Sequence, residues 1–148
     1  MIPRHGEAVQ PGRRYGLRPG AYAVLMRGRD VLLTFQEEPK PEFQLPGGGI
    51  DRGEQVLPAL HREVMEETGW TMRLSRRLGA FRRFTYMPEY DRWAEKLCTI
   101  YLGRPALRRG PPTEPGHHAV WMPLPDAIRM VGVDGDRRAL HRVARSGL

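Results

Sequence analysis

The apolar positions in the first third of the chain fall into short runs separated by glycine and proline. Residues 21–26 and 31–35 are continuous apolar runs rich in β-prone side chains, and the segment 28–30 between them is typical of a hairpin turn. A shorter run at 43–45 predicts a third strand. The following proline and three glycines, residues 46–49, predict a tight turn that larger side chains would obstruct.

The apolar period then changes from that of a strand to that of a helix. Leu57, Leu60 and Val64 recur at a spacing of three and four residues, which places them on one helical stripe. The pattern predicts a helix over residues 55–68, ended by Gly69 as the residue after the last turn. One side of this helix should pack against the rest of the protein.

The second half of the chain predicts more strands and a final helix. Strands are expected at 74–84, 96–102 and 119–122, with a loop at 86–93 between the first two, and a closing helix at 136–145 that turns Leu140 and Val143 inward. This order of elements predicts a mixed sheet covered by helices, an α/β fold in a single domain. Residues 1–19, rich in proline, glycine and arginine, read as an irregular arm before a domain at 20–148.

The polar side of the 55–68 helix is crowded with acid. Glu63, Glu66 and Glu67 stand at i, i+3 and i+4, so they share one face. Like charges at that spacing repel by roughly 0.2–0.5 kcal/mol per pair. A hard divalent cation relieves this repulsion, because Mg²⁺ binds oxygen ligands and combines carboxylates with substrate phosphates. The helix therefore indicates a metal site that handles phosphate.

These acids belong to a longer pattern over residues 48–70. A glycine is followed after five residues by a glutamate and after seven more by R-E-U-x-E-E-x-G-U, with U apolar; the fixed positions are Gly48, Glu54, Arg62, Glu63, Val64, Glu66, Glu67, Gly69 and Trp70. The pattern resembles the signature of the Nudix (MutT-like) hydrolase family, and its one departure is the bulky Trp70 where an aliphatic residue is usual. The resemblance implies a Nudix α/β/α sandwich with a mixed β-sheet.

The resemblance also implies roles for particular residues. Glu63, Glu66 and Glu67, with the carbonyl of Gly47, would hold Mg²⁺ or Mn²⁺, which neutralises phosphate charge and lowers the pKa of a bound water. Arg62 resembles the family's orienting arginine, and Glu54 its partner. Two positions stay open for the general base: Glu63 itself, or a glutamate outside the signature. For the second, Glu114 is the first candidate, with Glu89, Asp91 and Glu95 behind it.

The implied reaction is attack by water on a diphosphate, the activity of a pyrophosphohydrolase that acts on a nucleoside diphosphate linked to a group X. Nucleotide-pool, dinucleoside polyphosphate and ADP-ribose-like substrates all stay open. The candidate substrate contacts are Gly48, Arg82, Arg83, Tyr86, Tyr90 and Trp93, since arginine pairs with phosphate and aromatic rings stack on bases. Tyr22 and Phe84 are expected in the core, and His117 and His118 on the surface. A non-catalytic binding module is the alternative, but such domains usually lose glutamates that this chain keeps.

Charge and cysteine usage add a few expectations. The net charge of +7, from 22 arginines and two lysines against 17 acids, suits a polyanionic partner. RNA 5′-end pyrophosphohydrolysis is therefore a second alternative, although scattered arginines also suit a solvated surface. The single Cys98 fits a buried thiol in a reducing compartment, so we expect a cytoplasmic protein. We expect no membrane span and no secretory signal, and a homodimer is possible.

Overall fold

One mixed sheet, covered by helices on both faces, organises the chain. The computed structural model describes residues 1–147. Its elements in chain order are β1 (Gly16–Arg27), β2 (Asp30–Gln36), β3 (Glu42–Gln44), β4 (Gly47–Gly49), α1 (Val56–Thr68), β5 (Trp70–Met87), the 3₁₀ turn η1 (Pro88–Tyr90), β6 (Arg92–Arg108), β7 (His117–Pro123), α2 (Leu124–Met130) and α3 (Asp134–Arg145). The predicted α/β sandwich is confirmed.

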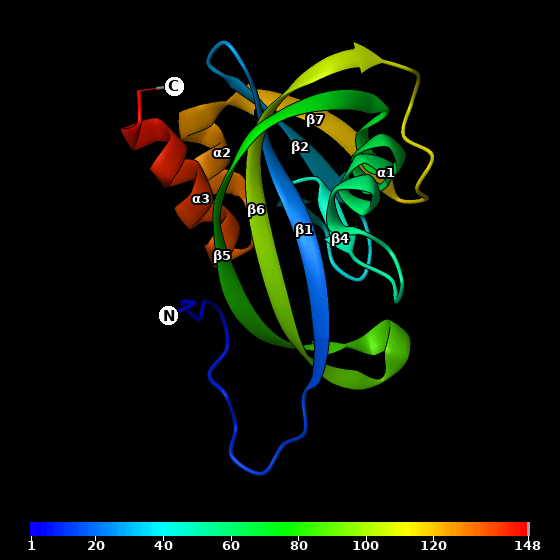
Figure 1. The fold of residues 1–148 in the computed structure, drawn as a ribbon, viewed down its shortest axis with the longest axis vertical. Helices are drawn as coiled ribbons and strands as arrows, with labels where there is room; N and C mark the ends of the chain where they lie inside the picture. The colour runs from blue at the N-terminus through cyan, green and yellow to red at the C-terminus, as the bar shows by residue number, and fades with distance from the viewer. Residues whose placement is uncertain (148) are drawn as a thin grey trace.

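The sheet has the strand order β3-β2-β1-β6-β5, with β4 paired to β1 and β7 to β2. Among the strand pairs within residues 1–147, only the central β1–β6 pair is parallel, running in register from Gly16 opposite Ala94 to Leu25 opposite Gly103. Helix α1 covers one face of the sheet, and α2 and α3 cover the other (Figure 1). No helix within residues 1–147 is both long enough and apolar enough to cross a bilayer.

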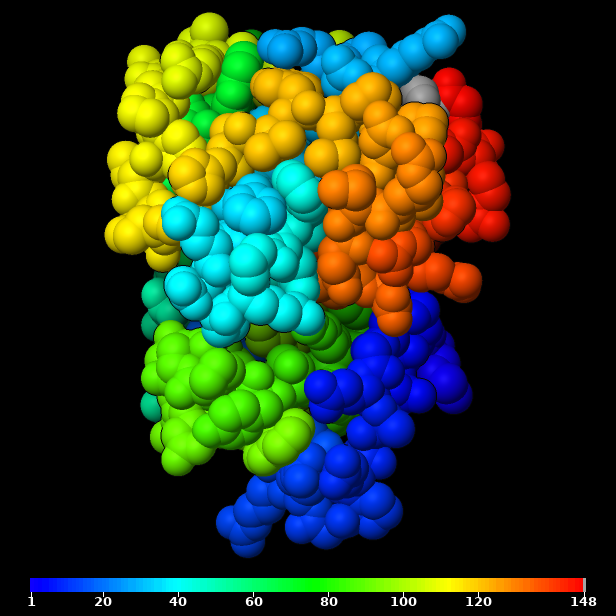
Figure 2. Space-filling view, turned by 180° about the vertical axis from the view of Figure 1, so that it is seen from behind, coloured from blue at the N-terminus to red at the C-terminus, as the bar shows by residue number. Residues whose placement is uncertain are grey.

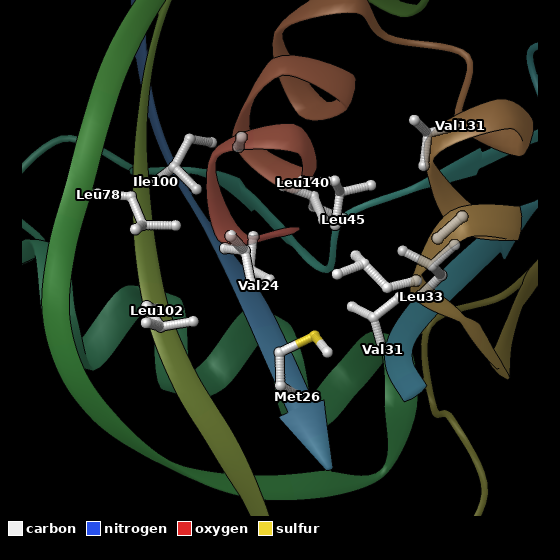
Figure 3. Packing of buried hydrophobic residues seen from close by; sticks show 14 of the residues in the cluster. Val24, Met26, Val31, Leu33, Leu45, Leu78, Ile100, Leu102, Val131 and Leu140 are labelled. Carbon is white, nitrogen blue, oxygen red and sulfur yellow. The ribbon is translucent and has the colours of Figure 1, made fainter. Parts of the chain in front are cut away.

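Strand β1 contributes side chains to two hydrophobic cores, because successive side chains point to opposite faces of the sheet. Val24 and Met26 point into the larger core beneath α2 and α3, where Ile100 and Leu140 join them (Figure 3). The alternate residues of β1 point to the other face and pack beneath α1. This smaller core comprises Ala21, Ala23, Leu25, Leu32, Leu60, Val64 and Met72. Leu140 and Val143 of α3 face inward as predicted.

The glycine segment is a strand, whereas the sequence predicted a tight turn. Gly47, Gly48 and Gly49 pair antiparallel with Tyr22, Ala21 and Gly20 of β1. A Cβ on Gly47, whose φ is 143°, would lie 2.2 Å from the carbonyl oxygen of Ala21. The glycines are therefore required for close approach of two backbones, rather than for a reversal of the chain.

Strands β5 and β6 are much longer than the sequence predicted, so the expected loop at 86–93 is the tip of one long hairpin. Tyr86 and Trp93 are paired across it, and η1 makes the turn. Helix α2 was not predicted, because its Leu124-Pro125 start reads as a loop, although proline is tolerated in a first helical turn. Leu57, predicted in the apolar stripe, is 44% exposed.

The unusual Trp70 also finds a packing partner on a neighbouring strand. Its ring lies edge-on to Trp121 at 5.7 Å between centroids, and the Arg27 guanidinium lies 4.0 Å from the centroid of Trp121. The bulky side chain is thus accommodated between β5 and β7.

The N-terminal arm lies along the edge of the sheet. Strand β1 begins at Gly16, inside the predicted arm of residues 1–19. The Pro3 carbonyl accepts from the Arg82 N–H at 2.8 Å, and the His5 N–H donates to the Arg82 carbonyl at 2.9 Å. The arm therefore extends the hydrogen bonding of β5 by one short bridge, a common way to protect an edge strand.

Candidate active site

Helix α1 presents the acidic residues because its opposite side is anchored. Leu60 and Val64 are fully buried against the sheet. The helix ends where Gly69 adopts a left-handed conformation with φ of 79° and donates to the Met65 carbonyl at 2.8 Å. The glutamates are therefore fixed on a helix whose orientation the core determines.

Arg62 is the centre of an ionic network on this helix. Its guanidinium makes a bidentate pair with Glu54, Nε to Oε2 at 3.1 Å and Nη2 to Oε1 at 3.0 Å. Its Nη1 reaches Glu66 at 3.2 Å and Glu63 at 3.3 Å. The hydrogen bonds from Arg62 and from the Asp51 N–H lower the pKa of Glu54. Arg62 thus holds three carboxylates around one planar cation.

Glu67 is buried, with only 7% of its surface exposed. Its Oε1 accepts the Gly47 N–H at 2.9 Å, so the carboxylate is tied to β4. Burial raises the pKa of Glu67 well above its usual range; the Gly47 bond opposes this shift, and the charges of Glu63 and Glu114 add to it. A buried carboxylate among other carboxylates is costly unless a cation is shared with it.

Glu63 lies against the middle glycine of β4. A Cβ on Gly48 would be 2.7 Å from the Glu63 carboxyl carbon, so the carboxylate needs a glycine beneath it. Burial raises the pKa of Glu63, while neighbouring Arg62 opposes the shift. Both Glu63 and Glu67 are therefore pressed onto the β4 backbone from the α1 side.

These donors fit a hard divalent cation, since they are oxygen ligands whose mutual repulsion and burial a cation would offset. A divalent cation is also what the resemblance of the 48–70 signature implies. Within residues 1–147 no three acidic, histidine or cysteine side chains already form a coordination set. Arg62 donates to Glu63 and Glu66, while Glu67 accepts the Gly47 N–H.

The loop that carries Glu114 is fastened to the end of α1. The N–H groups of Thr113 and Glu114 both donate to the Glu66 carbonyl at 2.8 Å, which leaves that orphan helix carbonyl satisfied. The charge of Glu114 raises the pKa of Glu63 and of Glu67. The structure thus brings Glu114 to the acidic cluster, whereas the other outside candidates, Glu89, Asp91 and Glu95, lie on the hairpin tip.

A cavity of about 450 Å³ opens on the other face of the sheet, between the 36–44 segment, the hairpin tip and α3. Figure 2 shows this hollow between the cyan segment and the green hairpin. Its lining includes Tyr22 of β1, which is the register partner of Gly47 in β4. Arg83, Lys96 and Asp136 also line it.

The six predicted substrate contacts do not all line one cavity. Gly48 contacts Glu63, and Arg83 and Tyr86 line the cavity. Arg82 points to the opposite face of β5, where it pairs with Glu95 at 3.6 Å. Tyr90 and Trp93 line a separate 320 Å³ cavity beside the tip, which Arg18 also lines, and the Trp93 ring lies 5.2 Å from that of Tyr86.

Trp93 is covered by the N-terminal arm, which the sequence did not indicate. The Arg13 guanidinium carbon lies 3.7 Å from the centre of its ring, and the Tyr15 ring packs edge-on at 6.3 Å. Arg13 thus occupies one face of the Trp93 ring, and stacking of a base on Trp93 stays a prediction. Phe84 and Cys98 are buried as expected, and burial raises the pKa of the Cys98 thiol to about 12.

Sequence reasoning missed one partly buried histidine and one buried aspartate. His117 was expected on the surface, but its Nδ1 forms a hydrogen bond of 2.9 Å with the hydroxyl of the buried Thr34. The same Nδ1 lies 3.8 Å from Glu67 Oε2. Asp136 is 3% exposed in α3 and receives the Leu45 N–H at 3.2 Å. His117 is the first residue of β7, where it pairs with Gln36 of β2. Extending the predicted strand at 119–122 back to residue 117 would have placed His117 in the sheet and, by alternation, on one of its faces.

Curated relatives carry related activities. A putative 8-oxo-dGTP diphosphatase of Bacillus subtilis is 33% identical over 70 residues, which cover 47% of either chain. An 8-oxo-(d)GTP phosphatase of Mycolicibacterium smegmatis is 31% identical over 105 residues, 70% of this chain and 30% of that protein. The chain thus matches about half of the first relative and less than a third of the second.

Solved structures and the sequence profile agree on the fold. A NUDIX hydrolase from Nitrosomonas europaea superposes with a TM-score of 0.71 at 17% identity, over 87% of this chain and 89% of that one. A MutT NUDIX hydrolase from Burkholderia pseudomallei gives 0.68 at 23% identity, over 86% and 98%. The NUDIX domain profile matches residues 16–143, which is most of the chain. Because of this match, and because the acidic helix packs against a glycine strand, we conclude that the chain belongs to the Nudix hydrolase family.

Proposed function

We propose that this chain is a Mg²⁺- or Mn²⁺-dependent pyrophosphohydrolase that cleaves nucleoside diphosphates linked to a further group. The observation that carries the proposal is the packing of Glu63 and Glu67 onto the β4 glycines, with Arg62 holding Glu54, Glu63 and Glu66. Glu63, Glu66, Glu67 and the Gly47 carbonyl would hold the metal. When bound, the cation neutralises phosphate charge and lowers the pKa of water.

The chain's own residues would position the reactants. The absence of a Cβ at Gly47 lets β4 approach β1, and its absence at Gly48 lets the Glu63 carboxylate lie against the β4 backbone. Glu63, or Glu114 from its loop fastened to Glu66, would take a proton from the attacking water, which is general-base catalysis. Arg62 would hold the carboxylates in the orientation that the reaction needs.

The nucleoside would occupy the 450 Å³ cavity beyond β4, where Tyr22 and Tyr86 offer rings and Asp136 a buried carboxyl. The names of the Bacillus subtilis and Mycolicibacterium smegmatis relatives support purine nucleoside triphosphates among the substrates. Cavity and relatives together favour a nucleotide over a non-nucleotide diphosphate.

A panel of compounds tests the proposal with purified protein and Mg²⁺. Nucleoside triphosphates, 8-oxo-dGTP, dinucleoside tetraphosphate and ADP-ribose are compared with inositol and isoprenoid diphosphates. We expect hydrolysis of nucleotides with release of a nucleoside monophosphate. Faster hydrolysis of an inositol or isoprenoid diphosphate than of every nucleotide would overturn the nucleotide assignment.

RNA 5′-end pyrophosphohydrolysis is a second candidate, favoured by one observation. An RNA pyrophosphohydrolase of Helicobacter pylori is 39% identical over 57 residues, 35% of this chain and 37% of that protein. The same panel therefore includes an oligonucleotide with a 5′-triphosphate. Preference for this RNA over the free nucleoside triphosphate would favour the second candidate.

A further inference from the structure

Three cations lie side by side on the cavity face of the sheet. Arg18 of β1 is the register partner of Lys96 of β6, and Lys96 is the register partner of Arg83 of β5. By alternation, Arg18 shares its face with Tyr22, and Lys96 shares its face with Cys98 of the larger core. The three residues, here called the cation row, therefore run across three adjacent strands.

The cation row weakens the fold that contains it. Like charges directly opposite on neighbouring strands are destabilising, and all three side chains are partly buried. The Arg18 Nε is buried without a hydrogen-bond partner. Within residues 1–147, no carboxylate oxygen lies within 4.0 Å of a charged nitrogen of the row.

The pKa of Lys96 reflects the repulsion within the cation row. Burial lowers the pKa of Lys96, and the charges of Arg83 and Arg18 lower it further, while Glu89 opposes the shift. By contrast, Arg73 and Arg104 face each other at the far end of the same hairpin, but both are exposed, where water screens the repulsion. The row is thus a partly buried cluster of three positive charges that makes no direct ion pair within residues 1–147, although Glu89 and Asp136 line the same cavity as Lys96 and Arg83.

One end of the row lies beside β4, and the other end lines the cavity. The Arg18 Nη2 lies 2.8 Å from where a Cβ on Gly49 would be, while the preceding Gly48 contacts Glu63 in the same way. At the other end, Lys96 and Arg83 line the 450 Å³ cavity. An anionic chain could therefore pass from the acidic helix over β4 and along the three cations.

We propose that Arg18, Lys96 and Arg83 form a subsite for a polyphosphate chain, so that substrates with three or more linked phosphates are preferred over diphosphates such as ADP-ribose. The inference rests on the proposed function and names its substrate class. Arginine binds phosphate oxygens in a bidentate manner and lysine as a point charge, so the row can contact successive phosphates. A phosphate bound there also removes the repulsion between the three cations.

The test compares two substrate classes in one variant. For Lys96→Met we expect kcat/KM to fall by about tenfold or more for a nucleoside triphosphate, mainly through KM, because a charge-assisted hydrogen bond is lost. For ADP-ribose the value should change little. Arg104→Met, which removes a charge from the exposed pair on the same strand, is the matched control and should leave both values unchanged.

Binding of inorganic tripolyphosphate without divalent metal gives a readout independent of hydrolysis. It should raise the thermal midpoint of the wild type and of Arg104→Met, and much less that of Lys96→Met and Arg18→Gln. Equal losses for both substrate classes, or an undiminished tripolyphosphate shift in the two row variants, would overturn the subsite. If the wild type hydrolyses no nucleotide, the proposed function fails, and the tripolyphosphate shift still decides whether the subsite exists.

Discussion

Replacing the buried Asp136 with asparagine should change how stability depends on pH. Burial raises the pKa of this carboxyl to about 7, opposed by the Leu45 N–H and by the charge of Arg83. In the unfolded chain the carboxyl ionises near its ordinary value of 3.8. Between these two values the folded protein keeps a proton that the unfolded chain has lost, so the free energy of unfolding must fall as pH rises.

The size of the effect follows from the difference between the two pKa values. One unit corresponds to about 1.4 kcal/mol, so the rise from 3.8 to about 7 corresponds to a total loss on the order of 4 kcal/mol. Two of these units lie between pH 5 and pH 7 and account for about 2.7 kcal/mol. Asparagine does not ionise, and its side-chain oxygen can still accept the Leu45 N–H, so Asp136→Asn should avoid this loss.

Urea unfolding of the wild type and of Asp136→Asn, measured from pH 5 to pH 8, checks this expectation. The difference between the two proteins isolates Asp136 from the histidines and glutamates that titrate in both. Asp134→Asn, two residues earlier on α3, is the control, because Asp134 is exposed and paired with Arg137 at 2.8 Å; it should follow the wild-type pH profile. Parallel profiles for Asp136→Asn and the wild type would refute the buried-carboxyl reasoning.

Two further predictions concern β4 and the general base. Gly47→Ala should lower the free energy of unfolding by at least roughly 1–3 kcal/mol, the range for one strained backbone position, because its Cβ would lie 2.2 Å from the Ala21 carbonyl oxygen. Urea unfolding measures this loss, with Gly53→Ala as the control, because a Cβ on Gly53 meets nothing within 4 Å at a φ of 87°. Equal losses in the two variants would contradict the close-approach argument. Glu63→Gln and Glu114→Gln should separate the two candidate bases, since general-base catalysis contributes about 10²–10⁴-fold in rate. A larger fall in kcat for Glu114→Gln, with unchanged metal affinity, would place the base in the loop. An unchanged kcat in both variants would exclude both residues as the base.

The acidic helix could be predicted from the sequence because its information is local. The spacing of Glu63, Glu66 and Glu67 fixes a shared face, and the stripe of Leu60 and Val64 fixes the buried side. The end of the helix at Gly69 was predicted for the same reason. Local spacing, turn chemistry and burial all agree there.

What the sequence could not give were pairings between distant segments. The three glycines of β4 carry no strand propensity, and only their contact with β1 makes them a strand. Trp93 lies in a polar stretch, yet the arm folds back to place Arg13 on it. The cation row has the same origin, since Arg18, Lys96 and Arg83 become neighbours only through strand register.

The central claim is that the glutamates of α1 form a metal-dependent centre for diphosphate hydrolysis. Its most direct test is the rate of nucleoside triphosphate hydrolysis in excess chelator, followed by a titration with Mg²⁺, for the wild type and Glu67→Gln. The account predicts no hydrolysis in chelator, recovery with Mg²⁺ in the wild type, and a rate lower by on the order of 10²-fold in the folded variant. Full wild-type activity in excess chelator would contradict it.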